Sequence, residues 1–218
     1  KLEKYKKADE VGVLLKKFDA ISVRDANSGA IVEQLTEKKP VYNLDPVLTY
    51  DYMNCCDKIP QLRVDEKYLI LYAYAGRISN EEADWIAAYA KKKNLKVYAI
   101  GGIQKCADRF VDCSPFEVLA YFRNAEEVIT DTFHGSIFSV ITHRPFTTLI
   151  RKSVGNSYGN EEKLSDLLER LDLADRMTAK VEDAENINEE TIDYAKVDEL
   201  LKAHREVAKE YLRSNLEG

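Results

Sequence analysis

Short apolar segments alternate along the chain with longer amphipathic segments. Apolar side chains recur every three or four residues at 2–17 and at 80–94, which predicts helices. Runs rich in β-branched and aromatic residues predict strands at 20–23, 41–44, 68–75, 96–100, 127–130 and 146–150. Strands that alternate with helices are typical of βαβ units. The pattern therefore predicts the α/β class, with a Rossmann-like, doubly wound parallel sheet.

Several local signals refine this pattern. The run at 68–75 is apolar on both faces, which predicts a central strand covered by helices on each side. Asp25 is a predicted N-cap of a helix that reaches about residue 37, and Ser114 with Pro115 predicts another helix start. A long final helix is predicted at 189–214. Its apolar stripe consists of Tyr194, Val197, Leu201, Ala208 and Tyr211.

The organisation of the chain predicts one domain. Its 218 residues, 45% of them hydrophobic, can bury one sizeable core. No repeat and no linker rich in glycine or proline interrupts the pattern, so we expect a single domain over residues 1–218. The chain opens with lysine rather than methionine, and we expect that an N-terminal part is missing.

Charge and composition exclude several classes of partner. The formal net charge is −6, and the lysines are spread among glutamates on the predicted helices, so we expect no nucleic-acid partner. The longest run with few charges, 128–142, is interrupted by Asp131 and His134 and is too short and too polar to cross a bilayer, so no transmembrane segment is expected.

The four cysteines suggest a reducing compartment. Cys55 and Cys56 are adjacent, and their spacing to Cys106 and Cys113 matches no zinc motif. Reduced thiols fit a cytoplasmic protein. Either Cys106 or Cys113 could act as a nucleophile, but inert structural thiols are the simpler interpretation.

Polar residues follow each predicted strand, and parallel strands bring their carboxyl ends to one edge of a sheet, where ligands bind. Three arginines at this edge suggest an anionic ligand, and no cluster of carboxylates and histidines predicts a metal. In chain order the edge carries Arg24 and Asp25, then Asp45, then Gly76 and Arg77, then Gly101 and Gly102, then residues 131–136, then Arg151.

The segment 128–136 is the most informative part of this edge. A strand ends there and a helix begins with His134 in its first turn, where backbone amides favour a phosphate or carboxylate. Gly135 allows close approach, and Thr132 and Ser136 carry hydroxyl donors. His134 could donate to an anion or transfer a proton near neutral pH.

Purely structural roles for the same residues stay open. His134 could be a hydrogen-bonded helix residue, and Asp131 could be the N-cap of the helix. Arg24 could form a salt bridge with Asp25 or with another carboxylate of the edge.

Several motifs resemble the bacterial polysaccharide pyruvyl transferase family, in the same order along the chain. They are Ile-Ser-Val-Arg-Asp at 21–25, Asp-Pro at 45–46, Ser-Pro-Phe-Glu at 114–117, and Val-Ile-Thr-Asp-Thr-Phe-His-Gly-Ser at 128–136. The similarity continues through Arg-Pro-Phe at 144–146 and Leu-Ala-Asp-Arg at 173–176, so it covers most of residues 18–177.

This resemblance implies two Rossmann-like domains arranged as in GT-B glycosyltransferases, with this chain as the C-terminal, donor-binding one. The implied reaction transfers pyruvate from phosphoenolpyruvate to a sugar of a cell-surface or extracellular polysaccharide, either free or lipid-linked, and needs no cofactor. By the resemblance, Arg24 and His134 are catalytic. The implied substrate-binding residues are Asp25, Arg77, Gly101, Gly102, Asp131, Thr132, Gly135 and Ser136.

One departure from the family and two other functions stay open. Some members have arginine where this chain has Thr132, and Arg77 or Arg151 is the candidate replacement. The resemblance assigns the base for the sugar hydroxyls to the absent N-terminal domain, so this chain alone is expected to be inactive. A glycosyltransferase that uses a nucleotide sugar and a binding domain without catalysis are the alternatives.

Overall fold

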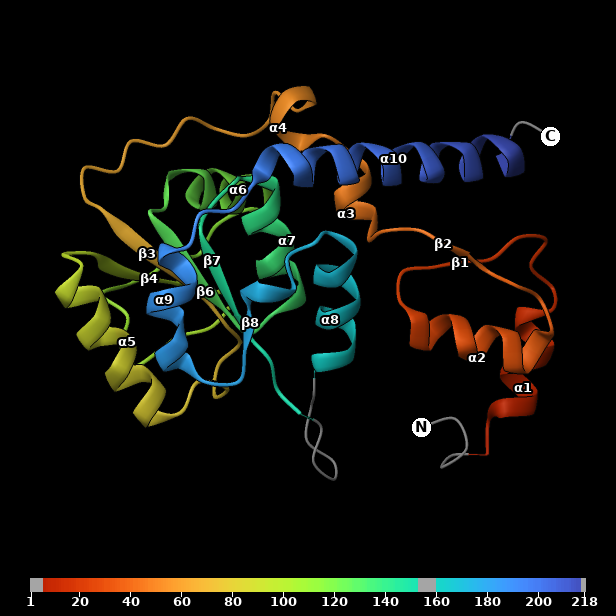
Figure 1. Ribbon diagram of the computed structural model, residues 1–218, viewed down its shortest axis with the longest axis horizontal. Helices are drawn as coiled ribbons and strands as arrows, with labels where there is room; N and C mark the ends of the chain where they lie inside the picture. Colours follow the sequence, from red (N-terminus) through yellow and green to blue (C-terminus); the bar gives the residue numbers. More distant parts are fainter. Residues whose placement is uncertain (1–5, 153–159, 217–218) are drawn as a thin grey trace. The chain divides into compact units, whose positions relative to one another are not determined.

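The computed structural model describes residues 6–152 and 160–216. The chain forms two compact units (Figure 1). Unit 1 contains Lys1–Tyr50 and Val197–Gly218, and unit 2 contains Asp51–Lys196.

Unit 2 is built on a six-stranded parallel sheet with the order β5-β4-β3-β6-β7-β8. The chain places β4 and β5 on one side of β3 and the later strands on its other side. The strand order therefore reverses between β3 and β6, which is the topological switch point of the sheet. The strands are β3 (Tyr68–Tyr72), β4 (Lys96–Ile100), β5 (Arg109–Phe110), β6 (Glu127–Thr130), β7 (Phe146–Leu149) and β8 (Met177–Thr178).

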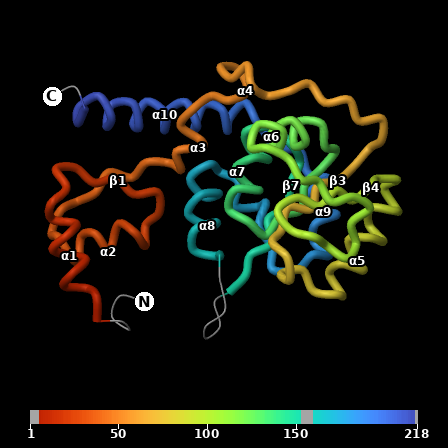
Figure 2. Tube along the Cα trace, turned by 180° about the vertical axis from the view of Figure 1, so that it is seen from behind, coloured from red at the N-terminus to blue at the C-terminus, as the bar shows by residue number. Residues whose placement is uncertain are grey.

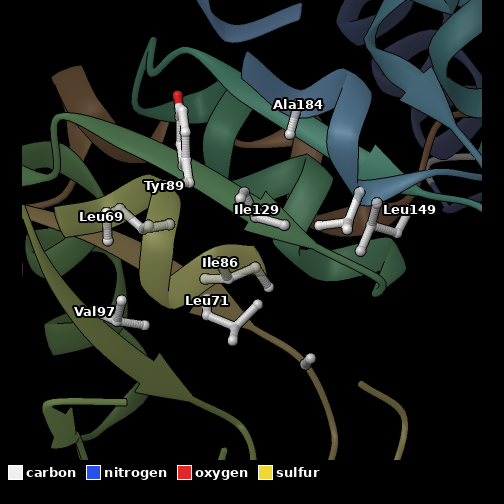
Figure 3. Close-up of a cluster of buried hydrophobic side chains, with 11 residues drawn as sticks. Leu69, Leu71, Ile86, Tyr89, Val97, Ile129, Leu149 and Ala184 are labelled. Atoms are coloured by element: carbon white, nitrogen blue, oxygen red, sulfur yellow. The ribbon is translucent and has the colours of Figure 1, made fainter. Parts of the chain in front are cut away.

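Helices cover both faces of this sheet, as its apolar strands require. On one face, α5 (Asn80–Lys92), η2 (Val181–Asp183) and α9 (Ala184–Glu189) pack on a buried cluster (Figure 3). That cluster includes Leu69, Leu71, Ile86, Ile129 and Leu149. On the other face lie α6 (Pro115–Asn124) and α7 (Phe133–Ile141), where Phe122 and Phe138 meet Tyr72 edge-to-face. The trace of these elements can be followed from behind in Figure 2.

The remaining elements of unit 2 are short or peripheral. They are α4 (Tyr52–Cys55), α8 (Glu161–Arg170) and η1 (Ala174–Arg176). Two helices begin with capping boxes, in which Ser79 pairs with Glu82 and Ser114 pairs with Glu117. Both boxes satisfy amide groups that the first turn of a helix leaves open. The predicted helix start at Ser114 is confirmed.

Unit 1 contains a small two-stranded parallel sheet, in which β1 (Ser22–Val23) pairs with β2 (Val41–Tyr42). Asp25 caps the connecting helix, because its carboxylate accepts a hydrogen bond from the Ser28 amide at 2.8 Å. The predicted cap at Asp25 is confirmed. The helices of this unit are α1 (Ala8–Leu15), α2 (Ala26–Thr36), α3 (Pro46–Thr49), and α10 (Tyr194–Leu216) from Val197 onward.

The predicted α/β class, with a doubly wound parallel sheet and a long C-terminal helix, is confirmed. The prediction that one sheet contains every strand was wrong, because β1 and β2 form a sheet of their own. Between β2 and β3 the described helices are only four residues each, too short for the crossover that would join parallel strands of one sheet. Arg24, Asp25 and Asp45 therefore follow strands of the two-stranded sheet and not strands of the six-stranded one.

Other boundaries also differ from those predicted. The short edge strands β5 and β8 were not predicted, and the predicted final helix begins later than expected, at Tyr194 of α10. Part of the first predicted helix lies at residues 1–5, outside the described residues, as does most of the irregular loop predicted at 151–160. Within the described ranges, no helix combines the length and the apolar character needed to cross a bilayer.

Candidate functional site

The switch point of the unit 2 sheet gathers most of the predicted site residues. Strand β3 leads into Tyr74 and Arg77, and the neighbouring β6 leads into Asp131. The Arg77 Nη1 atom lies 3.9 Å from the Asp131 Oδ2 atom, so this pair connects the two strand ends. The Arg77 guanidinium also stacks on the Tyr74 ring, 4.5 Å from the ring centroid. Open α/β sheets bind their ligands at this position.

Gly101 and Gly102 hold the loop after β4 against the loop after β3. A Cβ atom at Gly102 would lie 2.3 Å from the Ala75 amide nitrogen, so only glycine fits this backbone contact. The buried side chain of Gln104 donates to the Ala73 carbonyl at 2.9 Å. Gly101 has a φ of +84°, a conformation that favours glycine. The two glycines thus shape the edge, and direct ligand contact stays a prediction for both.

Thr132 organises the start of α7. Its Oγ1 atom accepts a hydrogen bond from the Gly135 amide at 2.9 Å and lies 3.1 Å from the Thr130 Oγ1 atom. A Cβ atom at Gly135 would lie 2.1 Å from the Thr130 Oγ1 atom, which excludes any larger residue. The alternative that Asp131 is the N-cap was wrong, because Thr132 fills that position.

His134 and Ser136 differ in burial and in the groups that their side chains contact. His134 is partly buried in the first turn of α7, with its ring near the rings of Phe133 and Phe138. Ser136 is fully buried, and its Oγ atom lies 2.8 Å from the Thr148 Oγ1 atom on β7. The Ser136 hydroxyl therefore links α7 to β7, and contact of the His134 imidazole with a ligand stays a prediction.

Asp131 is an unusual carboxyl group, because it is fully buried. Neither of its side-chain oxygens has a hydrogen-bond partner among the described residues. Burial raises the pKa of this carboxyl to about 6, while the guanidinium groups of Arg77 and Arg151 limit the rise and Glu82 adds to it. Perturbed ionisable groups of this kind cluster at functional sites.

Arg151 brings a second guanidinium to the edge from the end of β7. Its Nη1 atom donates to the Glu82 Oε1 atom at 2.6 Å, and its backbone amide donates to the Asn160 side chain at 2.6 Å. The Asn160 amide group in turn donates to the carbonyls of Asp131, at 2.7 Å, and Leu149, at 3.2 Å. Sequence reasoning missed Asn160 and Glu82, since a lone amide and a helix carboxylate give no local signal of these long-range contacts.

Arg24 lies in unit 1, after β1, and pairs with the buried carboxylate of Asp45. The expected alternative was a salt bridge to Asp25 or to another carboxylate of the predicted edge, and Asp45 is the carboxylate that pairs with Arg24. Arg24 also lines a mainly apolar cavity of about 370 Å³ within unit 1. His134 belongs to unit 2, so the predicted approach of Arg24 and His134 to one ligand stays a prediction.

The cysteines have the character of structural thiols. All four are free, and burial raises the pKa of Cys113 to about 11 and also raises that of Cys106, which keeps both thiols protonated. In the described ranges, no three side chains of histidine, cysteine, aspartate or glutamate come together as metal ligands would.

The sequence also matches a family model. The model for polysaccharide pyruvyl transferases matches residues 4–153, which is more than half of the chain. The chain belongs to the polysaccharide pyruvyl transferase family. For this pyruvyl transferase family member, the matched range includes Arg24 and every edge residue up to Arg151. No protein with curated annotation shows significant similarity to the sequence.

Solved structures resemble this family member at low sequence identity. They include the wall teichoic acid polymerase TagF, with 14% identity, a TM-score of 0.47 and coverage of 96% of this chain and 56% of that one. The O-GlcNAc transferase of Thermobaculum terrenum has 15% identity, a TM-score of 0.42 and coverage of 84% and 38%. UGT2 from Phytolacca americana has 13% identity, a TM-score of 0.41 and coverage of 90% and 48%.

These similarities concern the arrangement of helices and strands and do not extend to substrates. The chain spans about half the length of the solved structures it matches.

Proposed function

We propose that the carboxyl edge of the unit 2 sheet binds phosphoenolpyruvate, as the donor half of an enzyme that transfers pyruvate to a polysaccharide sugar. The match to the pyruvyl transferase family over residues 4–153 carries this proposal. The geometry supports it, because phosphoenolpyruvate has a carboxylate and a phosphate, and Arg77, Arg151 and the first turn of α7 lie at this edge.

The reaction requires the donor to gain one proton and two C–O bonds. A proton adds to the methylene carbon, which becomes a methyl group, and a sugar hydroxyl oxygen bonds to C2 and loses its proton. That released proton replaces the one taken up by the methylene carbon. Phosphate then leaves with the electron pair of its C–O bond, and a second sugar hydroxyl bonds to C2 and loses its proton. The products are a pyruvate ketal and inorganic phosphate.

We assign the acid to His134, either for the methylene carbon or for the departing phosphate. It is the partly buried imidazole in the first turn of α7, beside the proposed anion site. We assign Arg24 to the donor as well, on the resemblance of the segment 21–25 to the family. This second assignment requires the two units to share one ligand.

The first test is calorimetry of the chain with phosphoenolpyruvate and, separately, with UDP, GDP and CMP. We expect weak binding of phosphoenolpyruvate alone and a loss of at least about tenfold in His134→Ala, because one charge-assisted hydrogen bond is removed. His143→Asn is the matched control, since asparagine tolerates the φ of +53° found at this exposed histidine.

Binding of a nucleotide instead would support a glycosyltransferase that uses a nucleotide sugar. Binding of no ligand would support an assembly domain, whose association state light scattering after size exclusion would reveal. Either outcome would overturn the proposal.

A second test addresses Arg24 separately. Arg24→Ala should weaken phosphoenolpyruvate binding about as much as His134→Ala, if both contact the donor. Arg213→Ala is the control, because Arg213 lies on α10 in the same unit and is largely exposed. A loss in His134→Ala without a loss in Arg24→Ala would confine the donor site to unit 2.

A further inference from the structure

Four charged side chains meet where β3, β6 and β7 end. Arg77 and Arg151 supply two positive charges, and Asp131 and Glu82 supply two negative charges. They come from the loops after three neighbouring strands and from the first turn of α5. The group is electrically neutral when both carboxyls are ionised, so a bound anion would add uncompensated negative charge.

The two carboxylates of this group are not equivalent. Glu82 accepts hydrogen bonds on both oxygens, from Arg151 Nη1 at 2.6 Å and from the Ser79 amide at 2.8 Å. Asp131 is fully buried and accepts none on its side chain from the described residues, and its closest cation, Arg77, is 3.9 Å away. Burial without hydrogen bonds disfavours the ionised form of a carboxyl group, so ionised Asp131 is less stable than ionised Glu82. Added negative charge would therefore protonate Asp131 before Glu82.

Arg151 offers the complementary positive group. Glu82 occupies only Nη1, while the Nε and Nη2 atoms are buried and have no hydrogen-bond partner among the described residues. Two parallel donors on one side of a guanidinium match two oxygens of a phosphate or carboxylate. Arg151 can therefore bind an anion without releasing Glu82.

We propose that Asp131 determines the charge specificity of this edge, by taking up a proton when a multiply charged anion binds to Arg77 and Arg151. This inference rests on the proposed function of the same edge. In the ligand-free protein the carboxylates of Asp131 and Glu82 together balance the two guanidinium groups, and protonation of Asp131 leaves the four residues with a net positive charge for the anion. A dianion is thereby favoured over a monoanion, and the donor complex carries a carboxylic acid beside the ligand.

Sulfate is the appropriate first probe, because it stays a dianion throughout the pH range from 5 to 8. We compare the association constant of sulfate for Asp131→Asn with that for the wild type. The ratio of the two constants should be close to one at pH 5 and about ten or more at pH 8. The substitution removes a negative charge only where Asp131 is ionised. His134 also lies at this edge and is unchanged between the two proteins, so the ratio of their affinities isolates the effect of Asp131. Asp84→Asn, at an exposed position of α5, should keep a ratio of one at both pH values.

A second measurement needs no substitution. The carboxyl ¹³C signal of Asp131 in the wild-type chain reports its titration directly, and saturating sulfate should move the midpoint upward by about one pH unit. A midpoint that does not move, or an affinity ratio that is the same at pH 5 and pH 8, would overturn the inference.

Phosphoenolpyruvate, tested in the same way, separates this inference from the proposed function. If phosphoenolpyruvate fails to bind while sulfate moves the Asp131 midpoint, the donor assignment fails and the proton-linked anion site stands. If phosphoenolpyruvate binds and the midpoint does not move, the donor assignment stands and the role of Asp131 is refuted.

Discussion

At the carboxyl edge of the unit 2 sheet, the buried carboxyl of Asp131 destabilises the folded state when it is ionised. The folded state raises the pKa of Asp131 from 3.8 to about 6, mainly through burial. A raised carboxyl pKa contributes stability that is full below about pH 4 and is lost as pH rises through about 6. Asp131→Asn resembles the protonated form. We expect it to exceed the wild type in free energy of unfolding by up to roughly 3 kcal/mol at pH 7.5, and to match it at pH 4.

Urea unfolding at the two pH values measures this difference. Asp84→Asn serves again as the control, because Asp84 is exposed and pairs at the surface with Lys105. If Asp131→Asn were the less stable protein at pH 7.5, the attraction between the ionised carboxylate and its two arginines would outweigh the effect of burial.

At the scale of one element, the start of α7 depends on a single side chain. Thr132→Ala removes the hydrogen bond from the Gly135 amide, which should lower the free energy of unfolding by about 1 kcal/mol. It should also weaken phosphoenolpyruvate binding, because the turn that carries His134 loses its cap. Thr132→Ser keeps a hydroxyl and should restore both properties. Thermal unfolding and calorimetry measure the two effects.

Ser114→Ala is the matched cap substitution, on α6 after the outer strand β5. It should reduce stability by a similar amount and leave the affinity for phosphoenolpyruvate unchanged. Equal losses of affinity in Ser114→Ala and Thr132→Ala would indicate that general destabilisation, and not the start of α7, governs binding.

The helix caps also show how far sequence alone can predict an element. Asp25 and Ser114 were predicted correctly, because each cap is a contact between residues no more than three positions apart. At the start of α7 both Asp131 and Thr132 have side chains suited to an N-cap. The choice between them depends on the backbone after β6 and on the neighbouring Thr130, which local reasoning does not reach.

At the scale of the whole chain, the sequence predicted the strands better than their sheets. The segment after Arg24 and the segment after Gly76 both follow the βαβ pattern, but only the second belongs to the six-stranded sheet. Sheet membership depends on pairing between distant segments. The lack of a long amphipathic helix at 51–67 was the available signal. The cluster of Arg77, Glu82, Asp131 and Arg151 likewise joins positions up to seventy-four residues apart in the sequence.

The two units should also differ in local stability. Unit 1 has a two-stranded sheet, and its buried hydrophobic residues among the described ones are Val32, Leu44, Leu48, Val197, Leu201 and Ala208. Unit 2 contains the other buried hydrophobic residues, including the cluster in Figure 3. Two strands alone form a marginal sheet, and regions with few buried contacts open at lower free energy. Amides of β1 and α2 should therefore exchange hydrogen faster than those of β3 and β6, as measured by mass spectrometry.

Matched substitutions test whether the units open independently. Leu48 in α3 and Leu71 in β3 are both fully buried, and replacing either with alanine should remove about 2–5 kcal/mol of stability. Leu48→Ala should accelerate exchange in unit 1 and leave β3 and β6 unchanged, because the cavity lies outside their core. Leu71→Ala should accelerate exchange in β3 and β6. Acceleration of both units by Leu48→Ala would instead mean that the chain unfolds as one cooperative body, with unit 1 contributing to the stability of the sheet that carries His134.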